Sequence, residues 1–267
     1  MNTGCGALID HAFVVPVYGD SPYLEACLES LRAQTLQGSR IVVSSSTPSP
    51  YQEQAASRFD AEYSVHGPNR GIGADWNAAL ARGDRSWITI AHQDDVYAPL
   101  FVAQTMDAAS RSPDASMIFT RYSELSDGGV RPRSTMMRVK DALLEVGFIG
   151  ADRIGTESAK LRVLRLGCPI GCPAVTLGPS ALPHAFREDL RLDVDWEAWI
   201  RLAKGRGAFH YVRRELMQHR IHGKSETSAG IRDGRRRTED IEMFNMMWPK
   251  PIARLLARAY ALSYEAA

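Results

Sequence analysis

The stretch Trp87-Ile88-Thr89-Ile90-Ala91-His92-Gln93-Asp94-Asp95 decides the fold, because an apolar run of strand length passes directly into two carboxylates. A continuous apolar run is typical of a strand that is covered on both faces. An earlier run, Ala12–Val17, has the same character and passes into Tyr18-Gly19. Each run therefore predicts a buried strand with a polar end.

Strand and helix patterns alternate between these two runs. Residues 40–43 and 62–65 are expected to be strands, and helices are expected after Ser21 and after Gly71. Strand–helix alternation with short connections predicts right-handed crossovers and a mostly parallel, Rossmann-like α/β sheet flanked by helices. Ligands of such sheets bind at the carboxyl ends of the strands. We therefore expect Tyr18-Gly19, Ser44-Ser45-Ser46 and Asp94-Asp95 to share one edge.

Composition excludes several classes of protein. The 267 residues include 32 Lys and Arg against 31 Asp and Glu, a balance that argues against nucleic acid as a partner. No apolar run reaches the roughly 18–20 residues that span a bilayer, and the first residues lack the pattern of a secretory signal. These features predict a cytoplasmic protein.

Of the four cysteines, only Cys168 and Cys172 are close in the sequence. A zinc site needs about four ligands, and no second Cys or His pair with suitable spacing accompanies them. We expect reduced thiols.

The pair Asp94-Asp95 has two explanations. Adjacent ionised carboxylates repel one another unless a cation or water screens them, and Mg²⁺ or Mn²⁺ bound with substrate phosphate oxygens would do so. Alternatively the pair caps a following helix that has Pro99 in its first turn.

Several motifs, taken in order, resemble the inverting glycosyltransferase family 2, whose fold is called GT-A. The resemblance covers residues 12 to about 225. The motifs are Phe13–Gly19, Cys27–Thr35, Asn69–Gly73 with Asn77, Gln93-Asp94-Asp95, Asp195-Trp196-Glu197 with Arg201, and Arg220 with His222.

The resemblance implies a site for a nucleotide-sugar donor. Its nucleotide pocket would be lined by the end of the first strand, at Pro16, Val17 and Tyr18. Asp94 would face the sugar or ribose. Asp95 would hold Mn²⁺ or Mg²⁺ on the diphosphate.

The later motifs would complete the donor site. His222 would bind the metal or the diphosphate and Arg220 would clamp phosphate oxygens, although a solvated basic loop is the alternative. Asn69 and Gly71 would meet phosphate or ribose at a helix start, or form only a turn and cap. Asn77 belongs to the same motif.

Asp195 is the candidate general base, six residues before Arg201. A carboxylate suits the task of taking the proton of an acceptor hydroxyl. The neighbourhood is rich in acids, so Asp193 and Glu197 stay as alternatives, and Asp195 could instead cap a helix over residues 196–203.

The chain departs from the family after the second strand. Family members commonly place an acid there to recognise the base of the nucleotide, whereas this chain has Ser44-Ser45-Ser46-Thr47. Hydroxyls of Ser44 and Ser45 can still hydrogen-bond a base or ribose. The resemblance therefore leaves the donor nucleotide open.

Residues 1–230 are expected to form the GT-A domain, with a nucleotide-binding half to about residue 112 and an acceptor-binding half from 113. Residues 168–174 would line the acceptor pocket or simply pack in the core. Residues 231–267 are expected to form a helical extension, which includes Arg254 and Arg258. This extension would pack on the domain or lie on an anionic membrane surface.

The sequence thus predicts a metal-dependent inverting glycosyltransferase with Asp195 as base. The acceptor would be a hydroxyl of a glycan, a lipid-linked glycan or a metabolite, with a product such as a polysaccharide. Two alternatives are a non-catalytic protein that binds a nucleotide or glycan, and a nucleotidyltransferase. Nucleotidyltransferases usually carry a basic Gly-rich loop after the first strand, which Tyr18–Pro22 is not.

Overall fold

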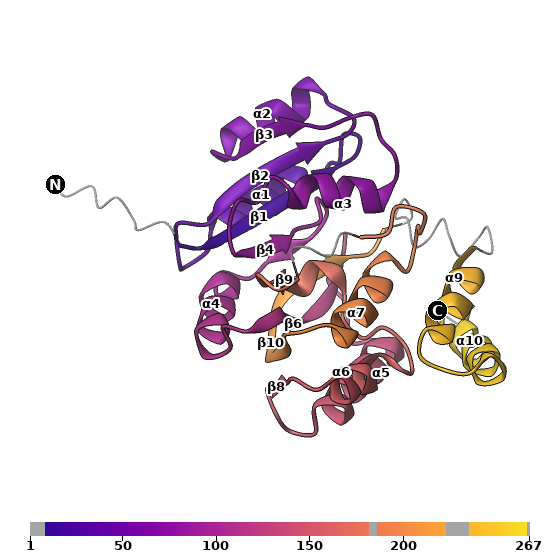
Figure 1. Cartoon of the computed structure of the whole chain (residues 1–267). Helices are drawn as coiled ribbons and strands as arrows, with labels where there is room; N and C mark the ends of the chain where they lie inside the picture. Colours follow the sequence, from indigo (N-terminus) through magenta and orange to yellow (C-terminus); the bar gives the residue numbers. More distant parts are fainter. Residues whose placement is uncertain (1–8, 182–185, 223–234, 266–267) are drawn as a thin grey trace.

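A computed structural model describes residues 9–181, 186–222 and 235–265. Its centre is a mixed sheet whose main path has the order β3-β2-β1-β4-β9-β6-β10-β5. Figure 1 shows the sheet running through the molecule with helices on both faces. This arrangement confirms the expected α/β class.

The first half is the parallel part of the sheet. β1 pairs in parallel with β2 and with β4, and β2 pairs in parallel with β3. Its elements are β1 (His11–Val17), α1 (Leu24–Arg32), β2 (Arg40–Ser45), α2 (Pro50–Arg58), β3 (Glu62–Val65), α3 (Ile72–Leu80), β4 (Trp87–Ile90), β5 (Val96–Tyr97) and α4 (Phe101–Arg111).

The second half adds long strands of mixed direction. β9 is antiparallel to both β4 and β6, while β10 runs parallel to β6. Its elements are β6 (Ala115–Ser126), β7 (Gly129–Val130), α5 (Thr135–Phe148), β8 (Arg153–Ile154), α6 (Glu157–Leu164), a 3₁₀ turn (Cys172–Ala174), β9 (Val175–Leu177), α7 (Val194–Lys204) and β10 (Ala208–Arg220).

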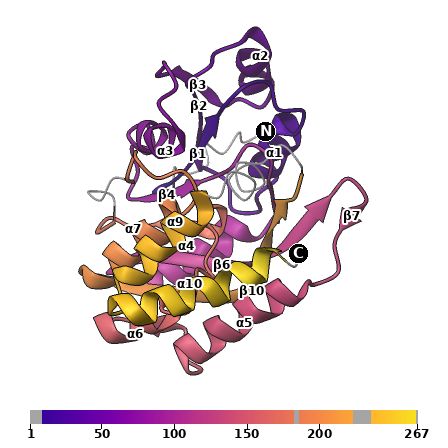
Figure 2. The same cartoon turned by 90° about the vertical axis from the view of Figure 1, so that its right-hand side faces the viewer.

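Two C-terminal helices cover one outer face of the second half (Figure 2). They are α9 (Arg235–Asn245) and α10 (Lys250–Glu265). The ring of Phe244 meets that of Trp196 edge to face at 5.0 Å, and Tyr260 lies 5.6 Å from the same ring. The expected C-terminal extension therefore shares a hydrophobic core with α7.

No helix in the described parts of the chain is both long enough and apolar enough to cross a membrane.

A buried ammonium group fixes the end of α7. The side chain of Lys160, which is almost fully buried, donates to the carbonyl oxygens of Leu202, Gly205 and Gly207 at 3.2, 2.8 and 2.8 Å. The last carbonyls of a helix lack partners within it and carry its negative dipole end, so a cation is favoured there.

Replacing Lys160 by Met should lower the free energy of unfolding by about 2 kcal/mol, because three carbonyl groups lose their donor. Chemical denaturation measures the change. The exposed Arg206, which lies between Gly205 and Gly207, provides the control, and Arg206→Met should stay within about 0.5 kcal/mol of the original protein. Equal effects of the two substitutions would contradict the role of Lys160.

Candidate functional site

The carboxyl ends of β1, β2 and β4 meet at one edge of the sheet. The amide of Gln93 joins two of them, accepting from the Tyr18 backbone N–H at 3.3 Å and donating to the Tyr18 carbonyl at 3.2 Å. The Gly19 N–H donates to Thr47 Oγ1 at 2.7 Å. Tyr18 itself is exposed at this edge. The convergence expected from the sequence is therefore present.

The three residues expected to line the nucleotide pocket are not equally accessible. Tyr18 is exposed and Pro16 is half-buried, but Val17 is buried in the core below the first helix. Val17 therefore packs in the core, and only Pro16 and Tyr18 of this group remain candidates for contact with a ligand.

Asp94 and Asp95 have opposite surroundings. The side chain of Asp95 is fully buried, where its Oδ1 accepts from His219 Nδ1 at 3.0 Å and from the Arg220 backbone N–H at 2.8 Å. Burial acts to raise the pKa of Asp95, but His219, His92 and the Arg220 backbone N–H together outweigh burial, so the pKa is lowered. The same carboxylate raises the pKa of His219 against the effect of burial.

This geometry favours Asp94 over the expected Asp95 as the partner of His222 in a metal site. The Asp95 carboxylate is engaged inside the protein, whereas His222 Nε2 lies 2.9 Å from Oδ2 of Asp94. The side chains of Asp94 and His222 are 25% and 20% exposed, so both reach solvent. Asp94 therefore has the access that Asp95 lacks.

Other residues hold Asp94 in place. Ser21 Oγ donates to Asp94 Oδ1 at 2.9 Å, and Arg220 Nε donates to the Asp94 carbonyl at 2.8 Å. The guanidinium group of Arg220 lies over the ring of Tyr23, 4.2 Å from its centre. Ser21 and Tyr23 belong to the stretch before α1, which sequence reasoning treated only as a helix start.

The donor set of Asp94 and His222 fits a divalent cation. In octahedral coordination at about 2.1 Å, adjacent ligand atoms lie about 3 Å apart, close to the spacing of these two atoms. Within the described residues no cluster of three or more His, Cys, Asp and Glu side chains could hold a metal. Phosphate oxygens and water would have to supply the other ligands.

At the end of β2, two of the expected donor-binding serines are occupied internally. Ser44 and Ser45 are fully buried. Ser44 Oγ lies 2.9 Å from His66 Nδ1, and Ser45 Oγ donates to Gln52 at 2.6 Å. Direct contact of Ser44 and Ser45 with a nucleotide is therefore not supported, because both hydroxyls face protein partners.

An acid does reach this end of β2, but from another element. Asp75 of α3 accepts from Ser46 Oγ at 2.8 Å and lies 3.2 Å from His66 Nε2. Sequence reasoning did not single out Asp75, because an acidic residue in the first turn of an expected helix is common and does not indicate a function.

The motif around α3 serves mainly to position backbone. Asn69 Oδ1 accepts from the Gly71 N–H at 2.7 Å, and Gly71 has a positive φ of 106° that favours glycine. Asn77 binds both the N–H and the carbonyl of Phe186, at 2.7 and 2.9 Å. Asn77 therefore fixes the loop before α7, and its expected contact with the donor is not supported.

The structure separates the three candidate bases. Asp193 and Glu197 are buried, Asp193 near Arg236 at 3.6 Å and Glu197 hydrogen-bonded to Arg201 at 2.8 Å. Asp195 is half-buried and accepts from the Trp196 N–H at 2.7 Å. Burial raises the pKa of Asp195, as suits a group that must take a proton.

The segment from residue 168 to 174 lies beside Asp195. Tyr97, two residues after Asp95, donates to the Pro173 carbonyl at 2.7 Å, and Trp199, one helical turn after Asp195, donates to the Ile170 carbonyl at 3.2 Å. The segment therefore joins α7 to the stretch that follows the Asp94-Asp95 turn. Cys168 and Cys172 are both free thiols, and burial raises the pKa of each.

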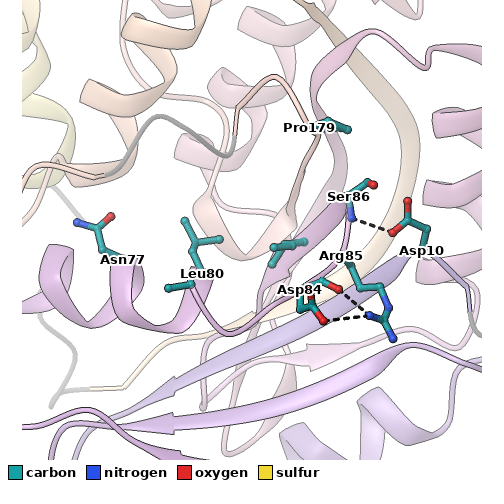
Figure 3. Close-up of a pocket in the computed structure, with 9 residues that line it drawn as sticks. Asp10, Asn77, Leu80, Asp84, Arg85, Ser86 and Pro179 are labelled. Atoms are coloured by element: carbon teal, nitrogen blue, oxygen red, sulfur yellow. Dashed lines mark hydrogen bonds and ion pairs between the residues drawn. The ribbon is translucent and has the colours of Figure 1, made fainter.

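A groove lined by Asp10, Asn77, Ser86 and Pro179 lies elsewhere (Figure 3). Asp10 precedes β1 and Ser86 precedes β4, so the groove lies at the amino ends of these strands. Ligands of parallel sheets bind at the opposite edge, where Asp94 lies.

Comparison with known proteins also indicates a glycosyltransferase. The family model described as Glycosyl transferase family 2 matches residues 12–178. The glycosyltransferase EpsH of Bacillus subtilis is 28% identical over 123 residues, which are 44% of this chain and 35% of EpsH. An uncharacterized glycosyltransferase of Rickettsia felis is 22% identical over 218 residues, or 80% and 34%. The chain thus spans about a third of the length of each relative.

Solved structures share the fold. S. aureus TarS 1–349 in complex with UDP-GlcNAc has a TM-score of 0.65 and 13% identity, covering 95% of this chain and 72% of TarS. The mannosyltransferase PcManGT of Pyrobaculum calidifontis, in complex with GDP-Man and Mn²⁺, has a TM-score of 0.59 and 14% identity, covering 97% and 75%.

Proposed function

Because the chain belongs to glycosyltransferase family 2, we propose that it transfers a sugar from a nucleotide-sugar donor to a hydroxyl acceptor with inversion at the anomeric carbon. The observation that carries the proposal is the segment 168–174, which hydrogen-bonds to Tyr97 just after the Asp94-Asp95 turn and to Trp199 one helical turn after Asp195. This segment brings Asp195, which is suited to proton transfer, near Asp94, which is suited to cation binding.

Asp94 and His222 would hold the cation. One carboxylate and one imidazole suit Mn²⁺, and the complex of PcManGT with GDP-Man and Mn²⁺ supports that choice over Mg²⁺. The bound ion would stabilise negative charge on the departing diphosphate. Arg220, held between Tyr23 and the Asp94 carbonyl, would present further positive charge to the same oxygens.

Asp195 would act as the general base. The acceptor hydroxyl oxygen forms a bond to the anomeric carbon while the bond from that carbon to the diphosphate oxygen breaks, its electron pair leaving with the diphosphate. The hydroxyl proton passes to Asp195. A carboxylate of raised pKa accepts that proton more readily than a fully solvated one.

The donor nucleotide would be selected at the end of β2. There the buried Asp75 holds the hydroxyl of Ser46 and the ring of His66, and of these three residues His66 is the one that stays partly exposed. UDP-GlcNAc and GDP-Man occur in the complexes of the two structural neighbours, so uridine and guanosine diphosphates are the first candidates.

The outer face of α10 would rest on an anionic membrane surface. Ile252, Leu255 and Leu262 are exposed along this helix, and the basic residues Arg254 and Arg258 are exposed beside them. No acidic residue occurs between Glu242 and Glu265. A helix with an apolar stripe and a basic border matches the interface of an anionic bilayer, where a lipid-linked acceptor would be found.

Metal-dependent donor binding tests the first part of the proposal. Calorimetry with UDP, GDP and dTDP, each with and without Mn²⁺, should reveal one nucleotide whose binding needs the metal. Asp94→Asn should weaken that binding more than about tenfold, because the cation loses a charged ligand. The control Asp84→Asn, at the opposite edge of the sheet, should bind as the original protein does.

Asp95→Asn discriminates between the two carboxylates. We expect it to lower the melting temperature, because Asp95 holds His219 and the Arg220 backbone inside the protein. The opposite result would be a loss of Mn²⁺-dependent binding in Asp95→Asn without a change in melting temperature, together with normal binding in Asp94→Asn. That result would identify Asp95 as the metal ligand. No binding of any nucleotide with any metal would defeat the proposed function.

Asp195→Asn should lower kcat by about 100-fold or more while leaving donor affinity unchanged, because an amide cannot accept the proton. The measurement is release of the nucleoside diphosphate from the donor found by calorimetry. In the original protein the rate should fall as pH drops through the raised pKa of Asp195. Glu197→Gln should instead lower stability, and retained kcat in Asp195→Asn would remove Asp195 from the mechanism.

Vesicle sedimentation tests the membrane surface. The protein should bind phosphatidylglycerol-containing vesicles but not pure phosphatidylcholine, and Leu255→Glu should weaken binding about tenfold. Val65→Glu, which charges an exposed valine on β3, is the control. Equal binding by both variants, or a concentration-dependent dimer that Leu255→Glu dissociates, would contradict the proposal.

A further inference from the structure

Glu239 of α9 binds three consecutive backbone N–H groups of the segment that leads into α7. Its carboxylate accepts from Arg191 at 3.1 Å, from Leu192 at 2.8 Å and from Asp193 at 3.0 Å. Glu239 is buried, with 6% of its surface exposed. A buried carboxylate that accepts several N–H bonds forms strong, charge-assisted interactions.

These bonds hold the backbone that enters α7, up to and including its N-cap residue. Its N-cap residue, Asp193, makes no capping hydrogen bond with its own side chain, which lies 3.6 Å from Arg236. The N–H groups at the start of a helix lack internal partners and favour a negative charge nearby. Glu239 supplies that charge from a helix that lies more than 40 residues later in the chain.

The same pair of C-terminal helices also holds the residue after Asp195. The ring of Trp196 is fully buried against Phe244 of α9 and Tyr260 of α10. The Trp196 N–H donates to the Asp195 carboxylate at 2.7 Å. Contacts from α9 and α10 therefore fix the backbone on both sides of Asp195.

We infer that Glu239 is a positioning residue for Asp195, so that the C-terminal helices complete the catalytic site. This inference rests on the proposed function. Lys160 already fixes the far end of α7, so movement at the near end would tilt the helix and displace Asp195. A small displacement of a catalytic group lowers the rate far more than it lowers affinity for a substrate bound elsewhere.

Glu239→Gln tests the inference, because the amide keeps the size of the side chain but loses the charge and one accepting oxygen. It should lower kcat for donor turnover about 10- to 100-fold with little change in donor KM. The acidic limb of the pH–rate profile should move to lower pH, because a displaced Asp195 becomes less buried and its pKa falls.

Hydrogen exchange supplies a readout that does not depend on activity. Amides of residues 191–193 should exchange at least about tenfold faster in Glu239→Gln, since they lose their acceptor. The matched control is Glu242→Gln on the same helix, whose carboxylate pairs with Arg187 at the surface. If Glu239→Gln does not fold, Glu239→Asp keeps the charge but shortens the reach, and the same measurements apply to it.

The two proposals fail in different ways. Wild-type protein that turns over no donor overturns the proposed function and the role of Asp195 with it. Wild-type turnover together with unchanged kcat, pH profile and amide exchange in the Glu239 variant overturns only the inference about Glu239. A fall in kcat that Glu242→Gln reproduces equally would also overturn it.

Discussion

The sheet edge that carries Asp94 and His222 depends on the buried carboxylate of Asp95. Asp95 directly precedes β5, which pairs antiparallel with the end of β10, and its carboxylate accepts from His219 and Arg220 of β10. An unpaired carboxylate in this position would be costly, so these bonds stabilise the contact between β5 and the end of β10. His222 lies two residues further on and is thereby carried to Asp94.

Asp94 gains its accessibility from the same turn. The N–H of Asp95 donates to the His92 carbonyl at 3.1 Å, so the chain turns as soon as β4 ends. The turn directs one carboxylate inward and leaves the other at the surface. Two adjacent acids thus perform separate tasks, one structural and one suited to a cation.

The sequence predicted the first half of the fold well because its signals are local. Apolar runs of strand length, glycine at turns and polar strand ends are all set by neighbouring residues. The local pattern also identified Asp94-Asp95, whereas Asp195 and His222 became candidates through the resemblance to family 2. Side-chain alternation, however, ends where β4 gives way to a turn, so the pattern could not show which of Asp94 and Asp95 faces inward.

Other features depended on contacts between distant segments. Asp75 reaches the end of β2 from α3, and Asn77 binds a loop more than 100 residues away. Glu239 holds the backbone that enters α7, and it does so from a helix that the sequence presented as an extension. Nothing in the spacing of Asp193, Asp195 and Glu197 distinguishes them, because their different exposure arises from α9 and from Arg201.

The two halves of the site therefore owe their rigidity to different sources. The edge that carries Asp94 is built from strand ends. Moving any of these strands would disturb the hydrogen bonds to its neighbours in the sheet. Asp195 instead lies near the start of a helix whose ends are held by single buried charges, Lys160 and Glu239. Because side-chain contacts change more readily than a sheet, the position of Asp195 can shift more easily than that of Asp94.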